Sequence, residues 1–226
     1  MNMELDRARY RLALDGLVLP QFAAGQPARP FVVALEGPNG AGKSTLCRAL
    51  SRALEAPGCL GTDAPWFAEP LKTRMIREAD WFASAMFFLS GCFEQMRLLR
   101  NSAAPLIIMD RSLWSTLAVH AAQSPQRLEG LLAMLKPVAG QVPLPSLTIV
   151  LEASLAACQS RFARKSGAAR ALDELTATAA FHAREQDFYH WLARQVPTLV
   201  FLDVERASPA EVLEKAVALI RQKVPC

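Results

Sequence analysis

Short apolar runs alternate with longer amphipathic segments along most of the chain. Apolar runs without interruption are typical of strands buried on both faces of a sheet, and they predict strands at 31–36, 59–62, 105–110, 147–152 and 198–203. Helical periodicity predicts helices over 43–55, 70–77, 81–101, 113–120, 126–135, 154–164, 173–195 and 210–223. This alternation indicates an α/β domain with a mostly parallel sheet.

The N-terminal part of the chain does not continue this pattern. Residues 1–29 contain a short helical stretch followed by the connector LPQFAAGQPARP, and we expect them to form an N-terminal extension outside the sheet. Residues 30–226 have an ordinary size for one domain with its own core, so we predict a single domain there.

Composition narrows the class of protein. The chain is 52% hydrophobic and 20% charged, which is the opposite of the balance that produces intrinsic disorder. No apolar stretch approaches the roughly 20 residues of a membrane span, and the first residues, MNMELDRARYR, are charged where a signal peptide needs apolar residues. The five cysteines form no Cys-x-x-Cys pair, as expected for reduced thiols. We therefore expect a cytoplasmic protein with no membrane association.

The basic residues are mostly arginine, with 19 Arg and 6 Lys. Arginine binds phosphate oxygens through a rigid fork, so this bias suits a protein that handles phosphates, although a genome that prefers arginine codons explains it equally well. A net charge of +4 without clustered basic runs does not favour nucleic-acid binding.

Residues 37–44 carry the strongest chemical signal. They read G-P-N-G-A-G-K-S, a complete match to the phosphate-loop pattern G-x-x-x-x-G-K-[ST], between the apolar strand FVVALE and an amphipathic helix. In such a loop the glycines admit close backbone approach, Lys43 reaches the β- and γ-phosphates, and Ser44 is a Mg²⁺ ligand. We predict ATP and Mg²⁺ as cofactors. The residues expected to contact the nucleotide are Gly37, Pro38, Asn39, Gly40, Ala41, Gly42, Lys43, Ser44 and Thr45.

A second acidic position follows in the run PLIIMDR. The strand ends in Asp110, which the parallel sheet places beside the phosphate loop, where it can hold Mg²⁺ through water. Alternatively, Asp110 caps the helix that follows, although Ser112 can also do so. In the first case Arg111 projects toward the phosphoryl acceptor.

Four segments resemble the thymidylate-kinase-like nucleoside monophosphate kinases: GPNGAGKST, MDRSLWSTLAVHA, SRFARKSGAARALDE and FHAREQDFYHWLA. The resemblance covers roughly residues 30 to 224. It implies a P-loop NTPase fold, with a central five-stranded parallel sheet flanked by helices on both faces and a short lid at about 161–173. It also implies that Asp110 positions Mg²⁺ and that Arg111 positions the 5′-phosphate of the acceptor.

The same resemblance assigns the family's lid arginines to Arg161, Arg164 and Arg170. There is an independent physical reason to expect them, because transfer between two polyanions needs positive charge and the loop itself supplies only Lys43. Arg161 and Arg164 share a helix face, and the small residues 166–169 suit a closing loop. The alternative is a solvated helix end.

The acceptor pocket departs from the family pattern. Asn39 stands where the family has an acidic residue in the loop, and Phe93 aligns with an arginine of the central helix. Phe88 can stack on a base and Gln95 can read a base edge, while the plainer alternatives are a core aromatic and an exposed amide. Glu69 begins a Glu-Pro pair found in these kinases and in deoxynucleoside kinases, where the Glu is the base for a 5′-hydroxyl; it also fits an ordinary helix start.

Together these features predict an ATP- and Mg²⁺-dependent kinase. We expect it to convert a pyrimidine nucleoside monophosphate (dTMP-like, UMP or CMP) to the diphosphate, with a small-molecule acceptor and no nucleic-acid partner. The expected catalytic residues are Lys43, Arg111, Arg161, Arg164 and Arg170, Ser44 and Asp110 are the expected metal ligands, and Glu69, Phe88, Gln95 and Arg111 are expected to bind the acceptor. Two alternatives stay open: a deoxynucleoside kinase with Glu69 as base, and a low-turnover ATP-binding regulatory protein. A homodimer is one option, because similar kinases are commonly dimers.

Overall fold

The structure is a computed structural model of the chain. It describes residues 3–22, 30–60, 67–142, 144–162, 176 and 178–224.

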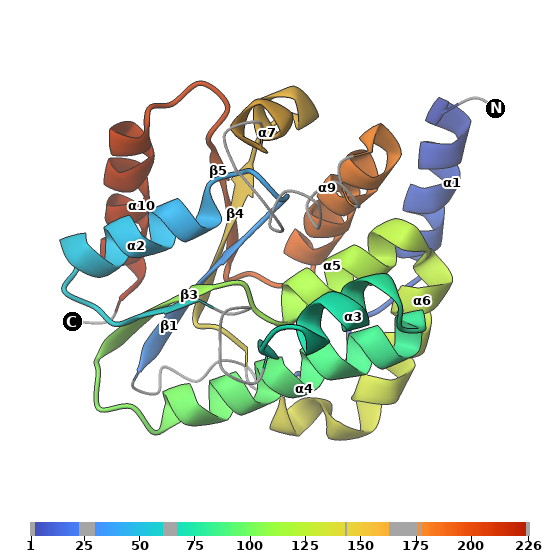
Figure 1. The fold of residues 1–226 in the computed structure, drawn as a ribbon, viewed down its shortest axis with the longest axis horizontal. Helices are drawn as coiled ribbons and strands as arrows, with labels where there is room; N and C mark the ends of the chain where they lie inside the picture. Colours follow the sequence, from blue (N-terminus) through green and yellow to red (C-terminus); the bar gives the residue numbers. More distant parts are fainter. Residues whose placement is uncertain are drawn as a thin grey trace.

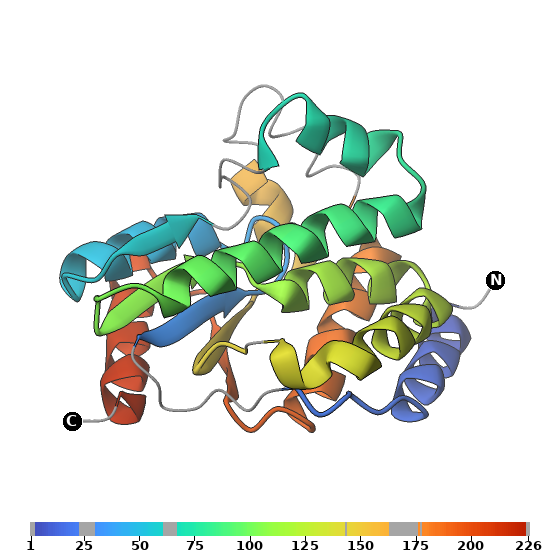
Figure 2. The same ribbon diagram turned by 90° about the horizontal axis from the view of Figure 1, so that it is seen from below.

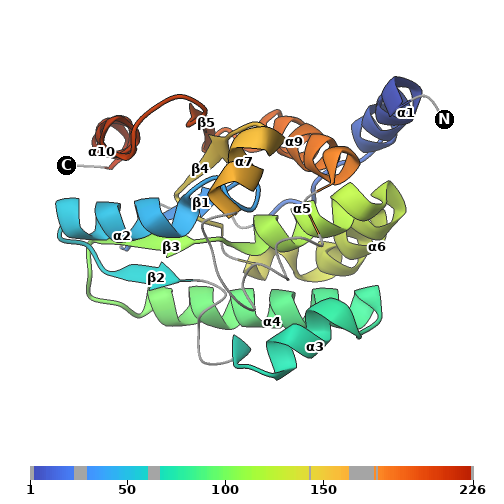
Figure 3. The same ribbon diagram turned by 45° about the horizontal axis from the view of Figure 1, so that its top comes forward.

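The centre of the molecule is a sheet of five parallel strands in the order β2-β3-β1-β4-β5 (Figures 1 and 3). The strands are β1 (Phe31–Glu36), β2 (Gly58–Leu60), β3 (Leu106–Asp110), β4 (Leu147–Glu152) and β5 (Leu199–Asp203). This confirms the predicted five-stranded parallel sheet. The strand boundaries agree with the prediction to within two residues, and only the edge strand β2 is as short as three residues.

The helices follow the predicted alternation. They are α1 (Met3–Asp15), α2 (Lys43–Ala53), α3 (Leu71–Arg77), α4 (Trp81–Arg100), α5 (Leu113–Gln123), α6 (Pro125–Leu135), the 3₁₀ helix η3 (Lys136–Gln141), α7 (Leu155–Phe162), α9 (Ala179–Ala193) and α10 (Pro209–Lys223). The sequence did not predict η3. The predicted helix 173–195 is described from Ala179, where Thr178 caps it by accepting a hydrogen bond from the Phe181 N–H at 3.2 Å; residues 173–175 lie outside the described part.

Helices cover both faces of the sheet, and successive side chains of a strand point alternately to one face and to the other. In β1, Phe31, Val33 and Leu35 pack with α2 and α10, whereas Val32 and Ala34 pack against Met96 of α4. Figure 2 shows α4 passing across the sheet, and Figure 3 shows α2 and α10 on the opposite side from α4. The helices α1, α4, α5, α6 and α9 share a second and larger core.

Helix α1 lies outside the sheet and packs on α9 (Figure 1). Its Tyr10 and Leu14 are almost completely buried in the larger core. In the described part of the chain, no helix combines the length and the hydrophobicity needed to cross a bilayer.

Candidate active site

The phosphate loop joins β1 to α2, and backbone conformation dictates its glycines. Gly37, Gly40 and Gly42 have φ angles of 116°, 86° and 104°, in the left-handed region that favours glycine. A Cβ atom at Gly37 would lie 2.4 Å from the carbonyl oxygen of Leu151, and one at Gly40 would lie 2.7 Å from that of Cys158. The loop is therefore packed directly against the end of β4 and against α7.

Lys43 is the first residue of α2 and its side chain returns into the loop. Its Nζ donates hydrogen bonds of 2.7 Å to the carbonyl oxygens of Gly37 and Pro38. Burial, together with the nearby charge of Arg111, lowers the pKa of Lys43 to about 7. Ser44, in the first turn of α2, is exposed. The loop thus presents a buried ammonium and an exposed hydroxyl at the amino end of a helix, where anions bind favourably.

Asp110 ends β3 beside this loop, paired in register with Leu35. It is 7% exposed, and no described residue forms a hydrogen bond to its Oδ1. Ser112 caps α5 by accepting from the Trp114 N–H at 3.3 Å, so Asp110 is not needed as the cap. A buried carboxylate oxygen without a hydrogen-bond donor among the described residues, next to a loop with an exposed hydroxyl, is a set of ligands suited to Mg²⁺, which prefers oxygen. The residues present therefore fit the metal that the sequence predicts.

Arg111 lies between the phosphate loop and a small cavity. Its φ of 74° is unusual for a residue with a side chain, and its N–H donates to the Leu35 carbonyl at 3.0 Å. The guanidinium donates to Ser115 Oγ at 2.9 Å and to Asn39 Oδ1. Asn39 therefore contacts the predicted acceptor-binding arginine directly, and its Nδ2 donates to Thr176 Oγ1 at 3.0 Å.

Glu36, at the end of β1, organises the turn that carries Arg111. Its carboxylate is fully buried and accepts from the Ser112 N–H at 2.7 Å and from Ser112 Oγ at 2.6 Å. Ser115 Oγ and the Tyr189 hydroxyl, the latter at 3.1 Å, donate to its other oxygen. Burial raises the pKa of Glu36, while the hydrogen bonds from Ser112 and Ser115 act in the opposite direction. The carboxylate joins β1, α5 and α9 at one point.

A small cavity lies next to Arg111. Its lining residues are Phe67, Phe88, Cys92, Gln95, Arg111, Ser112, Ser115 and Thr116. Phe88, Cys92 and Gln95 follow the i, i+4, i+7 spacing of one helix face, and Gln95 is 1% exposed, so the reading of this amide as a surface group is wrong. Phe93, the position aligned with the family arginine, packs against the larger core instead.

Aromatic side chains narrow this cavity. The rings of Phe67 and Phe88 are stacked, with centroids 5.4 Å apart and planes at 28°. The remaining volume is about 20 Å³, which holds one water molecule. A nucleobase is larger than this space and can therefore enter only if side chains that line the cavity move.

Glu69 does not line the cavity. It is exposed at the start of α3, where its carboxylate accepts from the Thr73 N–H at 3.1 Å and from Thr73 Oγ1 at 2.7 Å. These hydrogen bonds hold the pKa of Glu69 below its usual value. In this arrangement Glu69 serves the helix start, which was the plainer of its two sequence interpretations.

Of the predicted lid arginines, Arg161 belongs to the described residues. It donates to the carbonyl oxygens of Ala41 at 3.4 Å and Val204 at 2.8 Å, so it lies against the phosphate loop. Arg164 and Arg170 lie outside the described residues, as does most of the predicted lid.

The chain is similar to known proteins both in its sequence family and in its fold. A family model described as thymidylate kinase matches residues 35–215, most of the chain. The chain belongs to the thymidylate kinase family. This membership makes it a kinase of the nucleoside monophosphate class. No curated protein sequence matches it.

Solved structures share the fold of this thymidylate kinase family member. A thymidylate kinase from Candida albicans is 22% identical and superposes with a TM-score of 0.68, covering 86% of this chain and 92% of the other. Deoxyadenosine kinase from M. mycoides with bound dCTP is 16% identical, with a TM-score of 0.63 and coverages of 84% and 99%. The same enzyme with products gives a TM-score of 0.66 at 16% identity and the same coverages. At these identities the likeness concerns the fold.

In this family member, sequence reasoning missed Glu36, Ser115, Glu185 and Tyr189. Glu185 is 5% exposed, and burial raises its pKa while Lys43 and Arg111 act against that rise. One signal was available for Glu36, because a lone acidic residue closes the otherwise apolar strand FVVALE. The partners of that carboxylate come from α5 and α9, and such contacts are not visible in a local pattern.

Proposed function

We propose that this protein transfers the γ-phosphoryl group of ATP to the phosphate of a pyrimidine nucleoside monophosphate, giving the diphosphate and ADP. The observation that carries the proposal is the position of Arg111, which contacts the phosphate loop through Asn39 and also lines the cavity. A fixed guanidinium between donor loop and pocket is suited to a phosphate acceptor, because its fork binds two phosphate oxygens together.

Positioning and charge would do most of the catalysis. The acceptor phosphate already carries its nucleophilic oxygen, which would attack the γ-phosphorus as the bond to the ADP oxygen breaks, so no strong base is required. Lys43 and Arg161, with Arg164 and Arg170 from a lid over about 161–173, would offset the negative charge of the moving group. Ser44 and Asp110 would hold Mg²⁺, which neutralises charge on the β- and γ-phosphates when bound.

The pyrimidine preference is supported by the size and lining of the cavity. A base must displace the stacked rings of Phe67 and Phe88, and a single-ring base needs the smaller displacement. Phe88 would then stack on the base, and the buried amide of Gln95 would bind its edge. We propose a cytoplasmic enzyme that acts on free nucleotides.

The deoxynucleoside kinase alternative has one observation in its favour, the shared fold with deoxyadenosine kinase. It needs Glu69 as the base for a 5′-hydroxyl. Glu69 instead binds Thr73 and does not line the cavity, so that reaction requires the start of α3 to rearrange. The monophosphate acceptor requires no such change.

The test is an acceptor screen that measures ADP release with the common nucleoside monophosphates and with nucleosides, using Lys43→Ala as the inactive control. We expect turnover with a pyrimidine monophosphate. Arg111→Ala should lower kcat/KM for it by about 10²- to 10³-fold, while Glu69→Gln should change it by less than about threefold. Turnover of nucleosides that is lost in Glu69→Gln would instead favour the deoxynucleoside kinase.

A further inference from the structure

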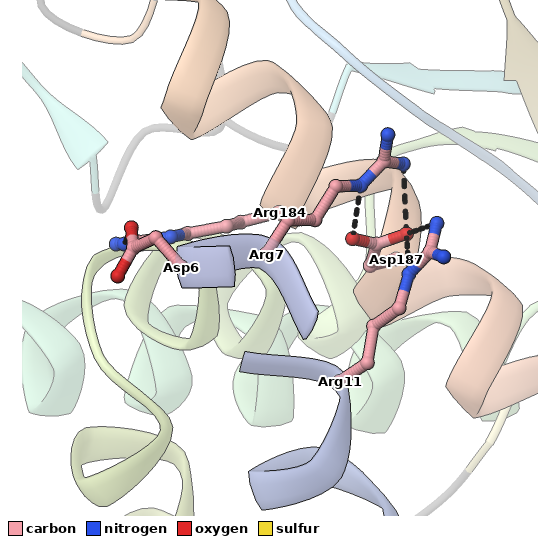
Figure 4. A network of polar contacts seen from close by, with 5 residues as sticks. All are labelled: Asp6, Arg7, Arg11, Arg184 and Asp187. Carbon is pink, nitrogen blue, oxygen red and sulfur yellow. Dashed lines mark hydrogen bonds and ion pairs between the residues drawn. The ribbon is translucent and has the colours of Figure 1, made fainter. Parts of the chain in front are cut away.

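Helix α1 is fastened to α9 by one buried carboxylate. Asp187, whose side chain is 2% exposed, lies between two arginines of α1 (Figure 4). Arg7 donates to its two oxygens at 2.7 and 2.9 Å, and Arg11 donates twice to Oδ1, at 2.9 and 2.6 Å. A buried carboxylate is costly unless it is paired, so α9 carries at this position a charge that depends on α1.

The contact continues along the seam between the two helices. Arg184 of α9 and Arg194, the residue that caps the end of α9, form ion pairs with Asp6 and Asp15, toward either end of α1. The guanidinium of Arg184 also lies 5.5 Å from the ring centroid of Tyr10. The positions that contact α1, 184, 187 and 194, follow the spacing of one helix face, so this face of α9 is turned toward α1.

A different stripe of α9 faces the active site. Tyr189 donates to Glu36, and Glu185 is buried close enough to Lys43 and Arg111 for the charges to interact. One short helix thus has α1 on one side and the site on the other.

A series of hydrogen bonds connects Tyr189 to Arg111, the arginine that we propose binds the acceptor phosphate. Tyr189 and Ser115 both donate to Glu36 Oε2, and Arg111 donates to Ser115 Oγ. Glu36 Oε1 accepts from both the N–H and the hydroxyl of Ser112, so the same carboxylate fixes the start of α5.

The segment after α1 contacts α5 and α9 as well. The ring of Phe22 packs edge-on against Trp114 of α5, with centroids 5.7 Å apart. The Leu19 N–H donates to Gln195 Oε1 at 2.9 Å, two residues after the end of α9. Residues 3–22 therefore contact both of the helices that supply partners of Glu36, and they precede residue 35, where the family match begins.

We propose that the N-terminal helix is a positioning element of the active site: Asp187, clasped by Arg7 and Arg11, holds α9 so that Tyr189 keeps Glu36 and the Arg111 turn in place. The part of this inference that concerns the acceptor rests on the proposed function. The part that concerns coupling between α1 and the 110–116 turn does not.

Coupling is tested first without activity, by hydrogen exchange. The variant Arg7→Gln/Arg11→Gln, called the clasp variant, removes both ion pairs to Asp187. Arg9→Gln is the matched control, because Arg9 is exposed on the same helix. We expect amide exchange in residues 111–116, which include the Ser112 N–H, to accelerate at least about threefold in the clasp variant and to stay unchanged in the control. Faster exchange confined to α1 would overturn the proposal. If the double variant does not fold, Asp187→Asn, which removes the charge and keeps the shape, is measured in its place.

The path through Tyr189 is tested by a double-mutant cycle. Tyr189→Phe should accelerate the same amides, and adding the clasp substitutions to it should produce little further change, because both act through one contact. Fully additive effects would overturn the role of Tyr189.

The kinetic arm separates this inference from the proposed function. The clasp variant should raise KM for the acceptor monophosphate about three- to tenfold and leave KM for ATP unchanged. In the control variant Arg9→Gln both KM values should equal those of the wild type. An unchanged acceptor KM in an active clasp variant contradicts the positioning role. If the wild-type protein turns over no monophosphate, the proposed function fails, and the exchange experiment still decides the coupling.

Discussion

Individual side chains at the site carry charges that burial makes sensitive to their surroundings. The Lys43 ammonium is held between two loop carbonyl oxygens, and burial and the charge of Arg111 bring its pKa to about 7. A triphosphate placed in the loop supplies the negative charge that raises this pKa again. Protonation of Lys43 and binding of ATP are therefore linked.

This linkage predicts that ATP binding weakens as pH rises above 7. The free protein loses the Lys43 proton near pH 7 and the complex retains it, so binding takes up a proton. The association constant should then fall by up to about tenfold per pH unit between pH 7 and 9. Titration calorimetry in buffers of different ionisation enthalpy measures the proton uptake directly. Lys43→Arg carries a fixed charge and should remove the dependence; an equally steep decline in that variant would assign the effect to another group.

A second residue prediction concerns Glu36. Its carboxylate accepts hydrogen bonds from three residues in a buried place, and Gln would present an amide NH₂ to some of those donors. We expect Glu36→Gln to lower the free energy of unfolding by about 1 to 3 kcal/mol, measured by urea denaturation.

Glu205 provides the matched control for this measurement. It also accepts from the N–H and the hydroxyl of one serine, Ser154, but it is exposed. Glu205→Gln should stay within about 0.5 kcal/mol of the wild type. Equal losses in the two variants would show that burial is not the cause.

The sequence predicted backbone conformation and helix capping at the site where a local motif determines them. The glycines of the loop, and Ser112 as the alternative cap to Asp110, follow from spacing alone. The environment of Gln95 could not be predicted, because Gln95 lines a cavity together with residues distant in the chain, such as Phe67 and Arg111. The role of Glu69 could not be predicted either. A base for a 5′-hydroxyl and an ordinary helix start are both compatible with the same Glu-Pro pair, and only the position of α3 distinguishes them.

At the scale of elements, the strands were predicted closely because each is a short apolar run between polar residues. The start of α9 was not predicted closely, because helical periodicity extends before Ala179. The sequence does not show which of several polar residues caps the helix, and in the structure the cap is Thr178. The 3₁₀ helix at 136–141 has no periodicity of its own that would reveal it. Helix α1 was predicted as an extension, but its burial against α9 required the tertiary structure.

The packing of the phosphate loop against the sheet predicts different losses of stability for alanine at Gly37 and at Gly42. Gly37 and Gly42 share a positive φ, but a Cβ at Gly37 meets the Leu151 carbonyl at 2.4 Å whereas one at Gly42 meets nothing within 4 Å. Gly42→Ala should therefore cost only the conformational strain of about 1 to 2 kcal/mol. Gly37→Ala should cost about 3 kcal/mol or more, because β4 must also shift. Equal unfolding free energies for the two variants, measured without nucleotide, would contradict the packing of the loop on β4.

For the whole molecule, the parallel sheet explains why distant residues form one site. The carboxyl ends of β1 and β3 lie side by side, and they deliver Glu36 with the phosphate loop and Asp110 with Arg111. The helix α4 contributes Phe88 and Gln95 to the cavity beside Arg111, where we propose that the acceptor binds. The family match covers this domain, and α1 adds a contact on the outer side of α9.

We propose that the acceptor carries a phosphate and that Arg111 binds it. The measurement that tests this is the ratio of kcat/KM for the best pyrimidine monophosphate to kcat/KM for the matching nucleoside, at saturating Mg²⁺ and ATP. We predict a ratio of about 10³ or more, which Arg111→Ala should lower by about 10²- to 10³-fold, because a site built around a charged group discriminates strongly against an analogue that lacks it. A ratio below one, or turnover no higher than that of Lys43→Ala with every acceptor, would contradict the claim.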